Sequence, residues 1–396
     1  MLTQTEKEKE ARENGLRIGH EIMAGKSGAT RDVPARGRHH FREASATAQY
    51  IGIPEKELLD AVSDFHRERV DSPPDTTRYP ETRGEREVLL QRYEGMREAG
   101  MSRTLVALHE SLTFWQKYRM PEQFGKIYNP VAVGELAERC RVVYMPESDQ
   151  GPLHFKNVDD PLSSWSPRPP EEQGQSWPHS PLFFDGTGSG LHIDEKAEEI
   201  FPLDVQGLCR EHCTTVEEVT EFMVRYNHFW DSSNLLVHDE EGNSVAFDKA
   251  SRGRIAVREP DSSGINYVNG MSSFDPEYQS FIDQQRQMYL DETGQDENSV
   301  EGRYFAACDQ VLHSMKQCMG ELKQDPTLSR LVDIMCRRDG KGPLCKSGER
   351  VHPDQPNRQA TLMQRLHFLN SHIMFRRQWR GDTPVWEDSW EQVCYR

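Results

Sequence analysis

Long apolar runs are absent from this sequence, and its first residues do not predict a secretory leader. Hydrophobic residues make up 35% of the 396 residues, and no apolar stretch approaches the roughly 18 residues needed to span a bilayer. The first residues, MLTQTEKEKEARENG, are charged and contain no apolar core of the kind that a signal peptide requires. We therefore expect a cytoplasmic protein without a membrane span.

Positive charge is also in short supply. There are 48 Lys and Arg residues against 65 Asp and Glu residues, which gives a formal net charge of -17. Binding to a nucleic-acid backbone needs a basic surface, so this balance excludes nucleic acid as an expected partner. The same acidity is compatible with a cationic or amine substrate.

Disulfide bonds are not expected in this chain either. The eight cysteines of an unsecreted protein are expected to be reduced thiols rather than disulfides. Cys209, His212 and Cys213 stand together in the segment CREHC, but further ligands at zinc spacing are missing. The sequence predicts neither a metal site nor a cofactor.

Two parts of the chain differ in pattern. Residues 1–139 are expected to be mostly helical, because 6–25 and 100–119 carry apolar residues at helical spacing. Strand-like runs begin at residue 140, and they alternate with loops rich in Gly, Pro and Ser. One of these loops, 163–181, is polar and contains many Pro and Ser residues, so it is a candidate lid over a site.

The second part predicts a mixture of hairpins and helices. Thr215 and Glu218 match a capping box at the start of an amphipathic helix. The expected hairpins, single strands and later helices cover 140–158, 234–250, 254–260, 264–270, 277–292, 301–322 and 327–338, with further strands near the C-terminus. Alternating blocks of helices and strands favour an α+β fold with antiparallel pairing over a doubly wound parallel sheet.

The most informative stretch is AERCRVVYMPESDQGPLHFKNVDD, residues 137–160. Cys140 opens the first strand of the predicted hairpin, where a cysteine without further signals is ordinarily a core residue. A thiol becomes a useful nucleophile when a base lies beside it, and breaking the peptide bond before Cys140 would free its own α-amino group as that base. The ordinary pKa of such an amine is about 7.7–8.0, so it can exchange protons with the thiol near neutral pH.

This stretch resembles the start of the mature chain in cysteine N-terminal nucleophile (Ntn) hydrolases. The similar branch contains choloylglycine hydrolases, isopenicillin N acyltransferase and acid ceramidase-like amidases, in which a strand ends in Arg-Asn-x-Asp. Lys156, Asn157 and Asp159 stand at the matching spacing after Cys140. The resemblance implies that Cys140 is the nucleophile and that Asp159 orients its amine. Lys156 replaces the Arg of the family, which keeps the charge but loses the planar fork.

Segments further along the chain resemble the family in the same order. Asn269 in INYVNGMSS falls where the family has its site Asn, and Arg303 falls on the helix that carries a charged group near the cysteine. Thr361 lies in a segment similar to a Thr-rich closing strand. The family segment that donates an Asn to the oxyanion corresponds to GTGSGLHID, which has no Asn, so Asn269 with a backbone N–H, or Asn234, would replace it.

The resemblance implies a four-layer αββα sandwich of two antiparallel sheets flanked by helices. Residues 1–139 would then form helical cover and a pro-segment, and 140–396 the catalytic core, together making one structural domain. The implied reaction is acyl transfer from, or hydrolysis of, a small-molecule or peptide amide, with an acyl thioester as a further donor class. Hydrolase and transferase both stay open, as does the oligomeric state, and secondary metabolism is the expected context.

A second interpretation is that the fold is kept as an unprocessed, non-catalytic binding or partner protein. Two features favour it: the missing Asn in GTGSGLHID, and the Glu138–Arg139 leader, where many relatives have Gly or Asp. A Cys–His protease is not expected, because His192, His228, His238 and His313 carry no local signature of that class and the flanks typical of papain are absent.

Overall fold

The computed structural model describes residues 2–24, 34–71, 85–125, 140–161, 182–188, 205–227, 233–251, 254–270, 272–338, 342–348 and 359–393. They form two compact units. The first contains the described residues up to 125 together with 205–207, and the second contains the other described residues from 140 onward. The predicted boundary at 139/140 and the predicted lid at 163–181 adjoin or fall on stretches outside the described residues.

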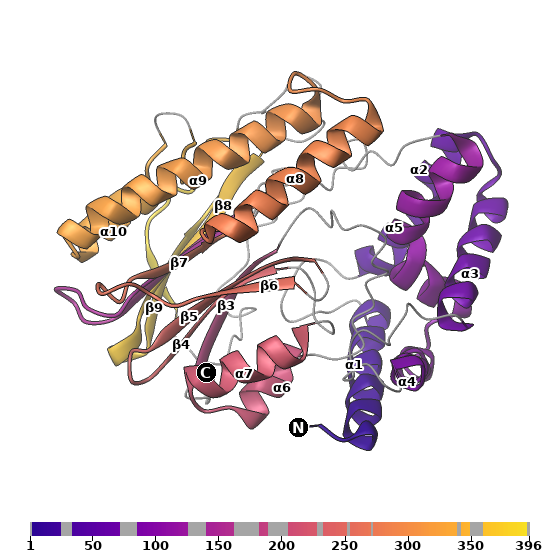
Figure 1. Cartoon of the computed structure of the whole chain (residues 1–396), viewed down its shortest axis with the longest axis horizontal. Coiled ribbons are helices and arrows are strands. Elements are labelled where there is room, and N and C mark those ends of the chain that lie inside the picture. The colour runs from indigo at the N-terminus through magenta and orange to yellow at the C-terminus, as the bar shows by residue number, and fades with distance from the viewer. Residues whose placement is uncertain are drawn as a thin grey trace. The chain divides into compact units, whose positions relative to one another are not determined.

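The described part of the first unit up to residue 125 is helical, as the spacing of apolar residues predicts (Figure 1). Its helices α1 and α4 pack closely, because a Cβ atom added at Gly15 would lie 1.9 Å from the carbonyl oxygen of Arg92. A Cβ atom added at Gly95 would lie 2.1 Å from the carbonyl oxygen of Arg12. The two helices therefore meet backbone to backbone. The helices are α1 (Gln4–Ala24), α2 (Pro34–Ile51), α3 (Glu55–Asp71), α4 (Glu85–Glu98) and α5 (Arg103–Phe124).

Two antiparallel sheets form the centre of the second unit. The larger has the strand order β10-β9-β8-β2-β1-β7, and the smaller has the order β3-β4-β5-β6. The predicted hairpins are confirmed as β1–β2 and β4–β5. The strands are β1 (Arg141–Met145), β2 (Leu153–Pro161), β3 (Leu182–Gly188), β4 (Ser233–Asp239), β5 (Ser244–Ser251), β6 (Arg254–Arg258), β7 (Asn266–Asn269), β8 (Gln359–Phe368), β9 (Ile373–Gln378) and β10 (Glu391–Val393).

Helices α6 to α10 belong to the part of the chain that carries the strands. The capping box predicted at Thr215 and Glu218 is present at the start of α7. Asp275, Ser299 and Thr327 cap the later three helices by accepting a backbone N–H from the first turn. The helices are α6 (Val205–His212), α7 (Val216–Arg225), α8 (Pro276–Thr293), α9 (Val300–Gln324) and α10 (Leu328–Met335), with a short 3₁₀ helix η6 (Leu369–Ser371) between β8 and β9.

Strand β1 shows how the layers are built. Val143 and Met145 point into a core shared with α9 and α10, whereas Val142 and Tyr144 pack against the smaller sheet. This alternation places the larger sheet between helices and the smaller sheet. Helix α7 contacts β4 and β5 from the other side of the smaller sheet (Figure 1). The predicted α+β class and the four-layer αββα arrangement are confirmed.

Candidate active site

Cys140 lies directly before β1, the strand between β2 and β7 in the larger sheet. It is half-buried and has a free thiol. The next residue, Arg141, pairs with Asn157 on one side and with Asn269 on the other. The register therefore brings the predicted nucleophile to the end of a central strand, between two segments that carry predicted site residues.

A buried ion pair holds the residue that follows Cys140. The guanidinium of Arg141 binds the carboxylate of Asp159, and its Nη1 also donates to the carbonyl oxygen of Leu344 at 3.1 Å. Thr361 Oγ1 donates to the second oxygen of Asp159 at 2.6 Å. Burial raises the pKa of Asp159 to about 6, although the Arg141 charge and the Thr361 hydrogen bond both act to lower it. Asp159 is thus fixed on the side chain of the residue that follows the nucleophile and is ionised at neutral pH.

An irregularity in strand pairing gives Asp159 this partner. Val158 pairs with Met363, but Asp159 pairs with Thr361, so β8 contains one extra residue, Leu362, at this point. In a regular register Asp159 would pair with Leu362, whose side chain cannot donate a hydrogen bond. The bulge therefore places the Thr361 hydroxyl on Asp159.

Asn157 lies on the helix-facing side of the same sheet and is fully buried. Its Nδ2 donates to the carbonyl oxygens of Met335 at 2.9 Å and Leu344 at 2.7 Å, and its Oδ1 accepts from Gln364 Nε2 at 2.9 Å. These bonds tie β2 to the end of α10 and to the segment that also binds Arg141. Asn157 therefore supports the position of Arg141.

Lys156 lies on the opposite face of β2, toward the smaller sheet. Its Nζ binds the Asp185 carboxylate on β3 and donates to the carbonyl oxygen of Gly186 at 2.7 Å. Asp185 also accepts a hydrogen bond from His154 at 3.1 Å and forms an ion pair with Arg365 at 3.6 Å. Burial acts against ionisation, but the charges of Lys156 and Arg365 keep the pKa of Asp185 well below its usual range. Lys156 is therefore a charged cross-link between the two sheets.

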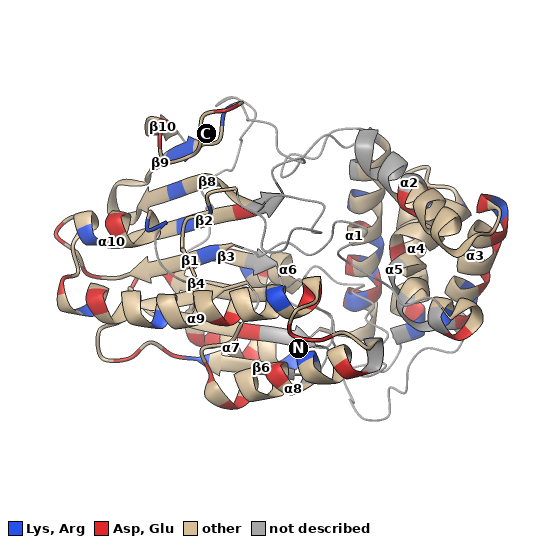
Figure 2. Ribbon diagram, turned by 90° about the horizontal axis from the view of Figure 1, so that it is seen from above, with Lys and Arg blue, Asp and Glu red and all other residues tan. Residues whose placement is uncertain are grey.

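These cations are part of a wider feature of the larger sheet. Basic residues occur along its strands β1, β2, β8 and β9, as Figure 2 shows in blue. Arg141, Arg376 and Arg377 are among those that are at least nine-tenths buried. A buried cation needs a carboxylate or a hydrogen-bond acceptor beside it. The side chains that serve as these partners are no longer available to a substrate.

The two predicted amides lie at the same end of the sandwich as Cys140. Asn234, at the start of β4, donates both of its Nδ2 hydrogens to the carbonyl oxygens of Asn269 and Ser272. It therefore holds the backbone at the end of β7 and has no side-chain N–H left for a substrate. Asn269 is 3% exposed, and its side-chain amide forms no hydrogen bond to another described residue.

Arg303 is the predicted site residue that the structure does not bring to this group. It is exposed near the start of α9 and donates to Asn298 Oδ1 at 3.0 Å. The buried side of that helix carries Tyr304, Phe305 and Cys308 instead. No hydrogen bond or ion pair joins Arg303 to the described residues around Cys140.

Two residues of the site, Arg141 and Ser272, were not predicted from the sequence. Arg141 follows Cys140 directly, but only its pairing with Asp159, 18 positions away, gives it a role. Ser272 is fully buried, and its Oγ has no hydrogen-bond partner among the described residues. Its only signal was its place three residues after Asn269, in the segment INYVNGMSS.

The described residues include neither a candidate metal centre nor a candidate membrane span. No group of three or more His, Cys, Asp or Glu side chains there could hold a metal ion. No described helix combines the length and the apolar character that a bilayer span demands.

Comparison with known proteins finds similar solved structures at low sequence identity. The sequence matches no family model and no curated protein. Similar solved structures include two variant forms of conjugated bile acid hydrolase from Clostridium perfringens, each 9% identical with a TM-score of 0.31. They cover 65% and 66% of this chain and 84% and 91% of their own. Penicillin V acylase from Agrobacterium tumefaciens is 12% identical with a TM-score of 0.28, over 63% of this chain and 78% of its own.

Proposed function

We propose that this protein carries out acyl transfer or hydrolysis at an amide, with Cys140 as the nucleophile. The observation that carries the proposal is the position of Cys140 at the start of a central strand, between Asp159 and Asn269. The fixed Arg141–Asp159 pair holds the backbone next to the thiol. The free amide of Asn269 lies one register position from it and can donate a hydrogen bond.

The mechanism begins with cleavage of the bond between Arg139 and Cys140, which frees the α-amine. The thiol of Cys140 then adds to the substrate carbonyl, forming a C–S bond while its proton passes to that amine. The resulting oxyanion would accept a hydrogen bond from Asn269, and Ser272 is a further donor at this end of the sandwich. The amine returns the proton to the leaving nitrogen as the C–N bond breaks, and water or an acceptor amine releases the acyl group from Cys140.

Asp159 contributes a negative charge in this scheme. The α-amine of Cys140 becomes an ammonium when it takes the thiol proton, and an ionised carboxylate nearby stabilises it. Because the pKa of Asp159 is about 6, this stabilisation would be lost as the pH falls below that value. Lys156 keeps the smaller sheet in place beside the site through Asp185.

A second candidate function is that of an unprocessed binding protein with the same fold. The observation that favours it is Asn234, which uses both side-chain N–H groups on backbone carbonyls. One of the two expected oxyanion donors is therefore occupied. In that case Cys140 would keep its peptide bond to Arg139 and would have no base.

Intact mass after expression tests the proposal. Cleavage before Cys140 would give fragments of about 16 and 30 kDa, in proportion to 139 and 257 of the 396 residues of the 45.7 kDa chain. Cys140→Ala should abolish both cleavage and amide turnover. Cys336→Ala is the matched control, because Cys336 is the other half-buried free cysteine of the described part of the chain. A full-length chain in which iodoacetamide does not label Cys140 would support the binding protein instead.

A further inference from the structure

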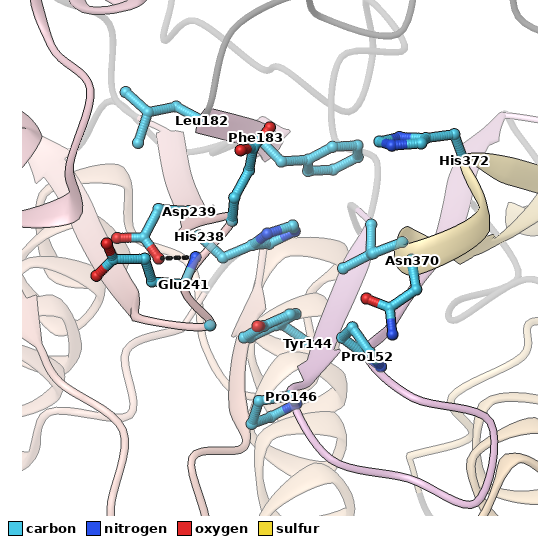
Figure 3. Close-up of a pocket in the computed structure, with 13 residues that line it drawn as sticks. Tyr144, Pro146, Pro152, Leu182, Phe183, His238, Asp239, Glu241, Asn370 and His372 are labelled. Carbon is cyan, nitrogen blue, oxygen red and sulfur yellow. Dashed lines mark hydrogen bonds between the residues drawn. The ribbon is translucent and has the colours of Figure 1, made fainter.

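A pocket of about 400 Å³ opens at the other end of the sandwich from Cys140 (Figure 3). It lies where the β1–β2, β4–β5 and β8–β9 turns meet the start of β3. Tyr144 in its wall is four residues along β1 from Cys140, which corresponds to about 13 Å of extended strand. The volume falls within the range of roughly 300–1,000 Å³ that is usual for small-molecule sites. The pocket is therefore separate from the proposed nucleophile.

A stack of three rings forms one wall. His238 lies nearly parallel to Tyr144, with ring centroids 4.2 Å apart and an interplanar angle of 8°. Its other face stacks on Phe183 at 4.8 Å and 10°. The stack fixes the plane of the imidazole, and it leaves only the ring edge for hydrogen bonding.

The imidazole edge has an unused polar atom. His238 is 3% exposed, and its Nε2 has no hydrogen-bond partner among the described residues. Burial, assisted by repulsion from His154, holds the pKa of His238 well below its usual range, so the ring is neutral. Leaving such a buried atom unpaired costs free energy, because it loses its hydrogen bond to water without gaining another. A bound molecule that hydrogen-bonds to Nε2 would remove this cost.

The rim beside this ring is acidic. Asp239, Glu240 and Glu241 lie together in the β4–β5 turn and line the pocket. Asp239 accepts the backbone N–H groups of Glu241 and Asn243, which shapes the turn. No basic side chain among the described residues forms an ion pair with any of the three carboxylates. The pocket therefore repels anions and attracts cations.

We propose that this pocket is a second, non-catalytic site that binds a small organic cation, an amine or amidine carrying an apolar group. The charged nitrogen would be attracted by Glu240 and Glu241 and would donate a hydrogen bond to His238. The apolar group would lie against the remaining surface, which includes Leu182 and Leu369. A bare metal ion does not fit, since the described residues offer no group of three ligating side chains.

The test is calorimetric titration of the full-length protein with benzylamine, benzamidine and benzyl alcohol. Benzyl alcohol has the shape of benzylamine without its charge. We expect saturable binding of both cations at concentrations up to about 1 mM, which corresponds to about -4 kcal/mol. Benzyl alcohol should bind at least about ten times more weakly, a difference of about 1.4 kcal/mol. Equal binding of benzylamine and benzyl alcohol, or no binding of either cation, would overturn the proposal.

Variants locate the binding. His238→Phe keeps the stacked ring but removes the nitrogen, and it should weaken benzylamine binding about tenfold or more, with folding checked by circular dichroism. The double substitution Glu240→Gln and Glu241→Gln removes two negative charges from the β4–β5 turn. It should weaken benzylamine binding severalfold and make the remaining binding less dependent on salt. Glu277→Gln with Glu297→Gln removes the same charge from exposed positions elsewhere. If that control pair weakens binding equally, the effect is one of net charge and the site is refuted.

Cys140→Ala separates this site from the proposed reaction. Binding of benzylamine should be unchanged in that variant, whether or not the wild-type chain is cleaved. If the substitution abolishes binding, the cation occupies the Cys140 end of the sandwich and the pocket at His238 is not its site.

Discussion

The two ends of the sandwich treat their buried polar groups differently. Around Cys140 most of these groups are paired: Arg141 with Asp159, and Asn234 with two backbone carbonyls. Around His238, the imidazole Nε2 has no hydrogen-bond partner among the described residues, and the carboxylates of the neighbouring turn form no ion pair with a described basic side chain. At the Cys140 end the paired groups fix the positions of the backbone and side chains. At the His238 end the unpaired groups are available to a ligand.

The same distinction applies within the Cys140 end. Asn234 and Asn269 are both buried amides, but only Asn269 keeps its side-chain N–H groups free of the described residues. Substitutions at the two ends should therefore differ in kind. At the first they should change catalysis or folding, and at the second they should change binding and leave the fold intact.

The largest expected effect is the loss of the nucleophile. Cys140→Ala should lower amide turnover by at least about 10³-fold, because the acyl-enzyme of the proposed mechanism forms on the Cys140 thiol. Turnover is measured with a chromogenic amide, using Cys336→Ala as the variant that should retain activity. Turnover that survives Cys140→Ala would assign the chemistry to another part of the chain.

The next effect concerns stability. Asp159→Asn leaves the buried Arg141 charge without its partner and should reduce the free energy of unfolding by about 3–5 kcal/mol. Thr361→Val removes only the hydrogen bond to Asp159 and should cost about 1 kcal/mol. Urea denaturation measures both. A similar cost for the two substitutions would mean that the ion pair contributes little.

These two predictions also show what the sequence could and could not provide. The hairpins, the capping box at Thr215 and the Cys140-to-Asp159 spacing depend on local patterns, and they were predictable. The pairing of Asp159 with Thr361 joins positions 202 residues apart across a bulge. No local pattern contains that information.

The same limit applies to Arg303 and His238. Arg303 was placed by its position in a segment, but which side of α9 faces the core depends on packing, and Arg303 is exposed. The stack of Tyr144, His238 and Phe183 unites three separate strands. The sequence could not predict this stack, because it depends on how the two sheets pack against each other.

A third prediction concerns the oxyanion. Asn269→Ala should lower kcat by about 10²–10³-fold and leave KM nearly unchanged, because the amide would act mainly on the transition state. Asn234→Ala should instead reduce stability, since Asn234 holds the backbone at Asn269 and Ser272. If Asn234→Ala lowers kcat more than Asn269→Ala in folded protein, the roles of the two amides are reversed.

A fourth prediction is a loss of stability in mild acid. Burial lowers the pKa of His154, His238 and His367, so each is neutral in the native state but takes up a proton when unfolded below pH 6.5. A histidine that stayed neutral in the native state over the whole range from pH 7.5 to 5.5 would cost about 1.4 kcal/mol, so the three together set an upper limit of about 4 kcal/mol.

Asp159 opposes this loss. Its native pKa of about 6 is higher than its unfolded value, so Asp159 takes up a proton in the native state on acidification, and this uptake returns about 1 kcal/mol. Urea denaturation at the two pH values should therefore show a net loss of stability at pH 5.5, of at most about 3 kcal/mol. No loss would mean that the histidines are protonated in the native state.

The smallest expected effect has the opposite sign. His238→Phe replaces a ring with an unpaired buried nitrogen by an apolar ring of similar shape, and it should raise the free energy of unfolding by about 1 kcal/mol. The same substitution should weaken binding of benzylamine. If His238→Phe is less stable than the wild type and binds benzylamine equally well, His238 is a structural residue. The proposed difference between the two ends of the sandwich would then be wrong.

The bulge in β8 divides that strand into two segments that should differ in how well they tolerate substitutions. From Met363 to Phe368 the pairing with β2 is regular, and Leu366 belongs to the core under α9 and α10. Beyond Leu362 the register starts again, with Thr361 opposite Asp159. Substitutions that repack the first segment can accumulate without moving the hydroxyl that holds Asp159. In evolutionary terms, one strand can be selected for packing along one part and for chemistry along the other.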